Sequence, residues 1–149
     1  MKAIDCYEYA LNIRNNFASA YYNCGNSYAS LGMYRKSIEY YMRSCELNPN
    51  DSYSFHNIAN SYFELDKYDE AIPYFRKALK LNPESFDSYF GLGSCHFNMN
   101  QYEKALDYFK KGLEINSHHA QLWFSKADTE QAMNLLEEAY ASYLKVIEI

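Results

Sequence analysis

The side chains that could do chemistry are few, and their spacing does not assemble a reactive site. His118 and His119 are the only adjacent histidines, and neighbouring residues do not share one helix face as metal ligands at i and i+4 do. We expect this pair in a solvated connector. Glu137 and Glu138 stand at the start of a helical pattern, where carboxylates stabilise the positive end of a helix dipole. These residues predict no catalytic, cofactor or metal site.

The cysteines give no sign of a redox or zinc motif. They are Cys6, Cys24, Cys45 and Cys95, and no Cys-x-x-Cys pair occurs. We expect all four to be reduced, with Cys24 and Cys45 acting as small buried hydrophobic residues. The sequence also lacks the Gly-x-Gly-x-x-Gly, Gly-Lys-Ser/Thr and Gly-x-Ser-x-Gly motifs. The prediction is that the protein is not an enzyme.

Composition argues against several classes of partner. Of 149 residues, 14 are Lys or Arg and 19 are Asp or Glu, a formal net charge of −5, whereas a nucleic-acid surface needs a basic stripe. Hydrophobic residues make up 48%, too many for a disordered chain. No apolar stretch approaches the roughly 20 residues that cross a bilayer, and Asp5 and Glu8 argue against a signal peptide. We therefore expect a cytoplasmic protein without nucleic-acid or membrane partners.

A period of 34 residues runs through the chain. Asn48-Pro49 recurs as Asn82-Pro83, and such a period indicates a repeat architecture. One aromatic column extends over five units, at Tyr7, Tyr41, Phe75, Phe109 and Tyr143. The period divides the chain into residues 1–17, 18–51, 52–85, 86–119 and 120–149.

Each full unit contains two helical patterns. In residues 52–85, Phe55, Ile58, Ala59 and Tyr62 fall on one face of a first helix. A second stripe follows on residues 71–79, and the next unit begins after Asn82-Pro83, where proline prevents the helix from continuing. The pattern predicts pairs of antiparallel helices.

One unit shows a complete signature of aromatic and small residues. Its members are Phe55, Ala59, Tyr62, Ala71, Phe75, Ala78 and Pro83. This signature resembles the tetratricopeptide repeat family, and the resemblance extends over the whole chain. It implies an all-α, right-handed superhelical solenoid of antiparallel helix pairs, about nine helices in a single array over residues 1–149. Some positions depart from the family pattern: His96 and Glu130 replace an aromatic residue, and Ser117 replaces proline.

The two ends match the repeat only in part. Residues 1–17 correspond to the second helix of a partial repeat, and residues 120–149 lack the closing turn. Terminal units of a solenoid normally carry a polar capping face, whereas the last helix presents Val146, Ile147 and Ile149. We expect a piece of a longer array, or end-to-end association with a second copy.

The resemblance implies a function as well as a fold. In this family the first helices of successive repeats line a concave groove that binds an extended or helical peptide, so the chain is expected to be a protein-interaction scaffold. The groove positions here are Tyr22, Asn23, Asn26, Tyr53, His56, Asn57, Asn60, Phe63, Phe90, Ser94, Phe97 and Phe124. Exposed aromatic residues suit interface anchors, and asparagine amides can pair with a peptide backbone. The charged groove residues Glu64, Asp87 and Asp128 are acidic, which favours a neutral or basic ligand over an acidic one.

Two narrower activities of the family can be compared with the groove positions. Co-chaperones grip a C-terminal carboxylate with two lysines, one arginine and two asparagines. At the matching positions this chain has Tyr22, Asn26, Asn57, Asp87 and Gly91, so both asparagines are present, every cation is absent and the clamp is disfavoured. Asn23 and Asn57 also resemble part of the asparagine ladder of O-linked N-acetylglucosamine transferases. The alternatives are therefore a substrate-recruiting arm of a larger, glycosyltransferase-like enzyme and a self-associating structural module.

Overall fold

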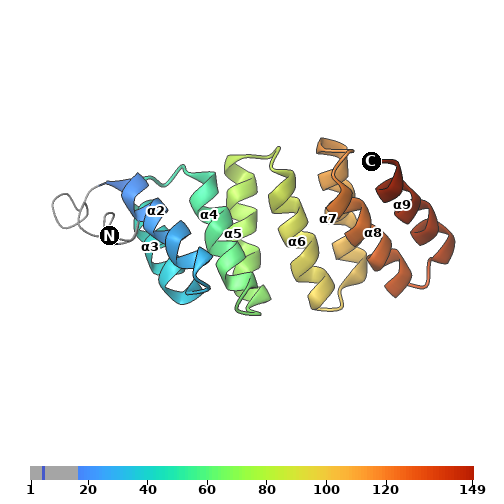
Figure 1. The fold of residues 1–149 in the computed structure, drawn as a ribbon, viewed down its shortest axis with the longest axis horizontal. Helices are drawn as coiled ribbons and strands as arrows, with labels where there is room; N and C mark the ends of the chain where they lie inside the picture. The colour runs from blue at the N-terminus through green and yellow to red at the C-terminus, as the bar shows by residue number, and fades with distance from the viewer. Residues whose placement is uncertain (1–4, 6–16) are drawn as a thin grey trace. The chain divides into compact units, whose positions relative to one another are not determined.

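The computed structural model describes Asp5 and residues 17–149, and in that part the chain forms eight α-helices. They are α2 (Ala18–Ser30), α3 (Tyr34–Leu47), α4 (Ser52–Phe63), α5 (Tyr68–Leu81), α6 (Phe86–Asn98), α7 (Tyr102–Ile115), α8 (Ala120–Ala132) and α9 (Leu136–Glu148). The all-α fold of paired helices is confirmed (Figure 1). The helix expected over residues 1–17 lies outside the described residues, apart from Asp5, which is helical.

The chain divides into two compact units, Met1–Leu81 and Asn82–Ile149. Unit 1 contains the pairs α2–α3 and α4–α5, and unit 2 contains the pairs α6–α7 and α8–α9. We call the first helix of each pair the A helix and the second the B helix. None of the described helices is long and apolar enough to cross a membrane.

The turn from each A helix to its B helix contains one residue in the left-handed conformation, at the same position of every described pair. It is Gly32, Asp66, Asn100 and Asn134 in the four pairs, with φ of 71°, 57°, 58° and 61°. Glycine, asparagine and aspartate are the residues that tolerate this conformation. The next backbone N–H then bonds back to the A helix, as from Met33 to the carbonyl of Tyr28 at 2.9 Å and from Lys67 to that of Tyr62 at 3.0 Å. This is a Schellman ending, which satisfies the last helical carbonyls.

Side chains cap the starts of α4, α6 and α8, whereas α2 has no side-chain cap. Asp51 accepts from the backbone N–H of Tyr53 at 3.1 Å at the start of α4. Ser85 accepts from Ser88 in the same way at the start of α6. Such caps satisfy donors that have no partner inside the helix, so each of these capped helices starts at a defined residue.

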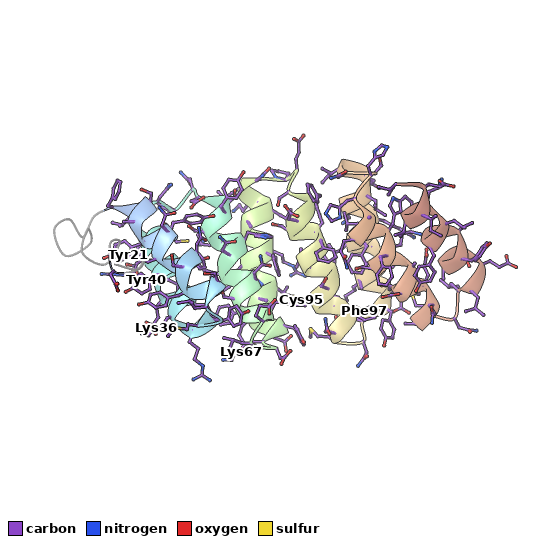
Figure 2. The ribbon with its side chains drawn as sticks, in the orientation of Figure 1. Tyr21, Lys36, Tyr40, Lys67, Cys95 and Phe97 are labelled. Carbon is purple, nitrogen blue, oxygen red and sulfur yellow. The ribbon has the colours of Figure 1, made fainter. Side chains whose placement is uncertain are left out.

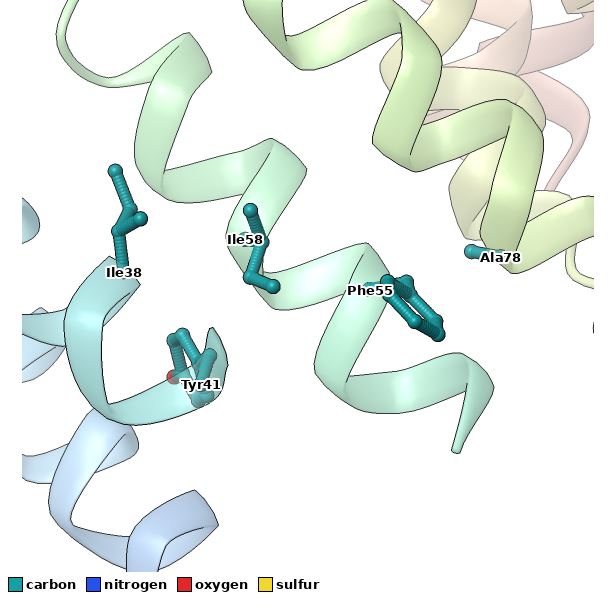
Figure 3. Packing of buried hydrophobic residues seen from close by; sticks show 5 residues of the cluster. All are labelled: Ile38, Tyr41, Phe55, Ile58 and Ala78. Atoms are coloured by element: carbon teal, nitrogen blue, oxygen red, sulfur yellow. The ribbon is translucent and has the colours of Figure 1, made fainter. Parts of the chain in front are cut away.

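Aromatic and aliphatic side chains fill the core of unit 1. Figure 3 shows Ile38 and Tyr41 of α3 facing Phe55 and Ile58 of α4, with Ala78 of α5 completing the cluster. All five are buried. The B helix of one pair is thereby joined to the A helix of the next by a continuous apolar core.

Unit 2 repeats this arrangement with different side chains. Ala105, Phe109 and Leu113 of α7 pack with Leu122 of α8. The ring of Phe109 covers Gly93 of α6 so closely that a Cβ on that glycine would lie 2.6 Å from Phe109 Cδ1. The absence of a side chain at Gly93 therefore allows α6 and α7 to approach closely.

Candidate functional site

Every helix pair places a ring of its A helix against a ring of its B helix. The pairs and their centroid distances are Tyr22–Tyr41 at 5.8 Å, His56–Phe75 at 5.5 Å, Phe90–Phe109 at 6.0 Å and Phe124–Tyr143 at 5.8 Å. The A-helix members are all residues predicted to contact a ligand. Their rings therefore lie partly on the core, because each packs on a ring of its B helix. We call the surface that these A-helix side chains form in each unit the A-helix face.

In unit 1 the A-helix face is held together by a polar network. Asn57 Nδ2 of α4 donates to the hydroxyl of Tyr22 at 3.1 Å and to Asn26 Oδ1 at 3.3 Å. Tyr41 of α3 donates its hydroxyl proton to the same Asn26 Oδ1 at 2.7 Å. The structure thus brings three predicted residues together and adds Tyr41, which the sequence reasoning assigned only to packing.

The Tyr41 hydroxyl stays protonated over the ordinary pH range. Burial is the main cause that raises the pKa of Tyr41, and the neighbouring Tyr22 adds to it. A buried neutral hydroxyl needs an acceptor, and Asn26 Oδ1 supplies one. In the structure the Oδ1 end of the Asn26 amide therefore faces Tyr41.

The other predicted residues of unit 1 are less closely linked. Asn60 Nδ2 lies 2.9 Å from His56 Nε2 within α4. The ring of Phe63 packs against Tyr68 at 5.3 Å, and Asn23 is half-buried. Tyr53 is 67% exposed, so it is the most accessible aromatic ring of this face.

In unit 2 three predicted residues are half-buried rather than open. Phe90 packs on Phe109, and Phe97 packs edge-on against Tyr102 at 5.5 Å. The backbone carbonyl of Ser94 accepts from Asn98 Nδ2 at 2.8 Å. Phe97 is labelled in Figure 2. Phe90 and Phe97 are therefore only partly accessible to a ligand.

The most open ring of the unit 2 face is Phe124, which is 44% exposed. One turn further along α8 lies Asp128, whose carboxylate accepts from the hydroxyl of Tyr143. The same hydroxyl lies 3.1 Å from Gln131 Oε1. The hydrogen bond to Asp128, with burial and the negative charge, raises the pKa of Tyr143 to about 12. An exposed ring next to a carboxylate is suited to contact a cationic side chain.

Charge is distributed unequally between A and B helices in unit 1. Neither α2 nor α4 contains a Lys, Arg, Asp or Glu, whereas α3 and α5 contain many. Glu64 lies at the end of α4, where its carboxylate accepts from the hydroxyl of Tyr34 at 3.4 Å. The A-helix face of unit 1 is therefore polar but uncharged along its helices.

Two histidines that could have marked a reactive site have structural roles. His96 is buried, lies 2.9 Å from Gln101 Oε1 through Nδ1 and stacks on Tyr108, so the core assignment is confirmed. His119 differs from the expected solvated connector, because it caps α8 by accepting from Leu122 N–H and packs on Phe86. Among the described residues, no three His, Cys, Asp or Glu side chains gather as a metal site.

None of the described cysteines forms a disulfide. Cys24 and Cys95 are buried, and Cys45 is half-buried. Cys95 is labelled in Figure 2. Burial raises the pKa of Cys45 to about 11 and of Cys95 to about 12, so both thiols remain protonated and unreactive near neutral pH. Cys6 lies outside the described residues.

Unit 1 has a hollow of about 310 Å³ that is lined mainly by residues of α3, α4 and α5. Its lining is Met42, Cys45, Glu46, Pro49, Phe55, Ile58, Tyr74 and Lys77. Lys77 Nζ lies 4.0 Å from the ring centroid of Phe55. Sequence reasoning did not identify this hollow.

Sequence reasoning also missed the hydroxyls of Tyr41 and Tyr143. A signal was present, because this column holds tyrosine in some repeats and phenylalanine in others. Where the B-helix residue is tyrosine, the A-helix residue fifteen positions earlier is an acceptor, Asn26 or Asp128. Asn60 and Ser94 stand at the same offset before the two phenylalanines, so the tyrosines and not the A-helix residues carry this signal.

Comparisons with known proteins agree with this geometry. Family models described as tetratricopeptide repeat match residues 18–51, 56–120 and 120–149, and one described as TPR repeat matches residues 2–32. None of the curated proteins compared with the chain matches it.

Solved structures with a similar fold include the following three. MamA is 23% identical, with a TM-score of 0.92 over 98% of this chain and 85% of its own. YrrB, described as a TPR protein with an unusual peptide-binding site, is 25% identical, with a TM-score of 0.82 over 98% of this chain and 75% of its own. The first TPR domain of Spaghetti (RPAP3), bound to the HSP90 peptide SRMEEVD, is 24% identical, with a TM-score of 0.76 over 78% of this chain and 93% of its own.

Proposed function

The chain belongs to the tetratricopeptide repeat family, and from that membership we propose that it is a protein-interaction scaffold whose A-helix faces bind an extended or helical peptide segment. The observation that carries the proposal is the repeated A-helix ring seated on a B-helix ring in all four described pairs. Rings held in this way lose little conformational freedom when a ligand contacts them.

Two residues supply the open aromatic surface. Tyr53 is exposed at the start of α4, and Phe124 is exposed on α8. Aromatic residues contribute strongly to interface energy because they cover a large area with few rotatable bonds. We expect each to contact an apolar side chain, or the stem of a long one, from the ligand.

Unit 1 is proposed to bind a neutral segment and unit 2 a basic one. The helices α2 and α4 contain no charged residue. They therefore provide no opposite charge for a charged peptide. In unit 2, Phe124 and the carboxylate of Asp128 lie one turn apart on α8, an arrangement that suits a Lys or Arg side chain. An acidic segment would meet like charge there.

Peptide binding by proteins of similar fold supports this reading. YrrB is described as having a peptide-binding site, and the first TPR domain of RPAP3 is bound to a peptide that ends in Glu-Glu-Val-Asp. The acidic peptide is not the class that we propose for this chain, because Tyr22, Asp87 and Gly91 stand where a carboxylate clamp needs cations.

Selection of short randomised peptides against the full chain tests the proposal. Selected peptides are then measured against Tyr53→Ser/Phe124→Ser, and against Leu81→Ser/Ile115→Ser, which removes two exposed apolar residues from B helices. We expect a tenfold or greater loss with the first pair only, about 1.4 kcal/mol or more. Equal affinity for both double variants, with circular dichroism showing that both remain helical, would place the binding surface elsewhere.

Self-association through α9 is a second candidate function, favoured by one observation. Ile147 is 81% exposed, whereas Leu113, its equivalent in α7, is 8% exposed and packs against α8. Concentration-dependent light scattering of the natural chain and of Ile147→Lys tests it. A monomer at high concentration in both samples would exclude this function.

A further inference from the structure

We infer that the hollow of unit 1 lined by α3, α4 and α5 is a second binding site, which accepts one large apolar side chain of a partner protein together with an adjacent aspartate or glutamate. None of the side chains that line the hollow belongs to the predicted residues of the A-helix face. The inference therefore goes beyond the proposed function and does not depend on it.

The hollow lies where one residue is smaller than its counterparts in the other repeats. Its volume is about 310 Å³, at the lower end of the range of ligand pockets. Cys45 of α3 is part of the lining, whereas the same position of the following repeats holds Leu79, Leu113 and Ile147. In unit 2, Leu113 is buried and packs with Leu122 of the next A helix. The shorter side chain of Cys45 thus leaves unfilled part of the space that a leucine occupies in unit 2.

The inner lining of the hollow is apolar and aromatic. Phe55 and Ile58 of α4, which Figure 3 labels, are both buried. Met42 of α3 and Tyr74 of α5 are half-buried, and Tyr74 stacks on Tyr62 with 5.6 Å between the ring centroids. This lining favours an aromatic or branched aliphatic side chain, because transfer of such a group out of water is favourable.

The rim of the hollow has one positive charge that no carboxylate neutralises. Lys77 of α5 is exposed, its Nζ lies 4.0 Å from the ring centroid of Phe55, and it forms no ion pair with a described residue. Glu46, the acidic residue of the lining, is paired with Arg43. Asp51, a second nearby carboxylate, is used as the cap of α4. A carboxylate beside the inserted apolar side chain would therefore find a cation at the rim.

A protein segment suits this hollow better than a small molecule. Glu46, Pro49 and Lys77 of the lining are all exposed, so the hollow is open to solvent at its rim. A small-molecule site normally encloses most of its ligand, whereas a partner protein covers an inserted side chain with its own main chain. Apolar anchors that fill a pocket in this way are typical of protein interfaces.

Selection of displayed short randomised peptides against the full chain tests the inference. Peptides are selected on the natural chain and then depleted on Cys45→Leu, which fills the hollow with the residue type of two other repeats. Cys45→Ser keeps the hollow open and is the control for this change. Lys77→Gln removes the charge from the rim without altering the apolar lining. Lys80→Gln, at another exposed position of α5, is its matched control.

We expect the remaining peptides to contain an aromatic or branched apolar residue next to Asp or Glu. They should bind at least tenfold more weakly to Cys45→Leu and about threefold more weakly to Lys77→Gln, and normally to Cys45→Ser and Lys80→Gln. Added salt should weaken their binding. Cys45→Leu should unfold at or above the natural temperature, because it fills open space. If it does not fold, the comparison of Lys77→Gln with Lys80→Gln decides.

Three results would overturn the inference. They are the absence of any peptide that distinguishes Cys45→Leu from the natural chain, equal affinities for Lys77→Gln and Lys80→Gln, and enrichment of Lys or Arg in place of Asp or Glu. Binding of the selected peptides to Tyr53→Ser/Phe124→Ser separates the two surfaces. Peptides of the hollow should bind this double variant normally, whereas loss of binding to it alone would assign them to the A-helix face and overturn this inference only.

Discussion

Lys126 and Glu130 form a salt bridge one turn apart on α8, and their side chains are only 14% and 4% exposed. Ser142 of α9 completes the group, because its hydroxyl donates to Glu130 Oε2 at 2.6 Å and accepts from Lys126 Nζ at 2.7 Å. The other three helix pairs have stacked aromatic rings at the positions of Glu130 and Ser142. These stacks are Tyr28–Tyr40, Tyr62–Tyr74 and His96–Tyr108. The last pair has therefore exchanged an aromatic stack for a buried ion pair.

Removal of one charge from this group should destabilise the last helix pair. Lys126→Met leaves the Glu130 carboxylate buried without its cation, which typically costs about 3–5 kcal/mol. The urea midpoint of helix loss, measured by circular dichroism, should fall. An unchanged midpoint would mean that Glu130 is accessible to water in solution.

The complementary triple variant should recover the loss. The variant Lys126→Leu/Glu130→Tyr/Ser142→Tyr introduces residue types that other pairs have at these positions. The leucine is found in α6, the first tyrosine in α4, and the second tyrosine in both α5 and α7. Replacement of a buried ion pair by packed apolar residues is often neutral or stabilising. We expect a midpoint at or above that of the natural chain. A triple variant less stable than Lys126→Met would show that the helices cannot close around a stack.

Gly93→Ala should destabilise unit 2 although alanine favours helix. The new Cβ would lie within 2.6 Å of the buried Phe109 ring, and overpacking of this kind typically costs about 1–3 kcal/mol. Thermal unfolding of Gly93→Ala, Phe109→Leu and the double variant forms a mutant cycle. The double variant should be more stable than the two separate losses predict. Simple additivity would contradict the proposed contact.

Much of the fold could be predicted from the period, and much of the polar chemistry could not. The period identified the columns that pack, so residues such as Phe75 and Ala59 were placed in the core, where both are buried. A column does not show which atoms of two helices meet, and for that reason the Tyr41–Asn26 contact was missed. Glu130 and Ser142 depart together from their aromatic columns, and that shared departure was the available signal for the ion pair.

Phe75→Ala should strongly destabilise unit 1. Its ring is fully buried and packs edge-on against His56, and Phe→Ala changes in a core typically cost about 3–5 kcal/mol. Arg76→Ala, at the next and exposed position of the same helix, is the control and should unfold at nearly the natural temperature. Similar unfolding temperatures for the two variants would reject the register of α5.

The Tyr143–Asp128 contact predicts a loss of stability at alkaline pH. The pKa of Tyr143 is raised to about 12 from its ordinary value of 10, so the folded chain holds this proton more tightly than the unfolded chain. The stabilisation is therefore complete below pH 10 and is lost as the pH rises from about 10 to 12. Tyrosine absorbance at alkaline pH and urea midpoints across this range measure it. Asp128→Asn keeps an acceptor but removes the carboxylate charge, so it should return the Tyr143 titration toward 10. An identical titration in Asp128→Asn would exclude the carboxylate as the cause of the shift.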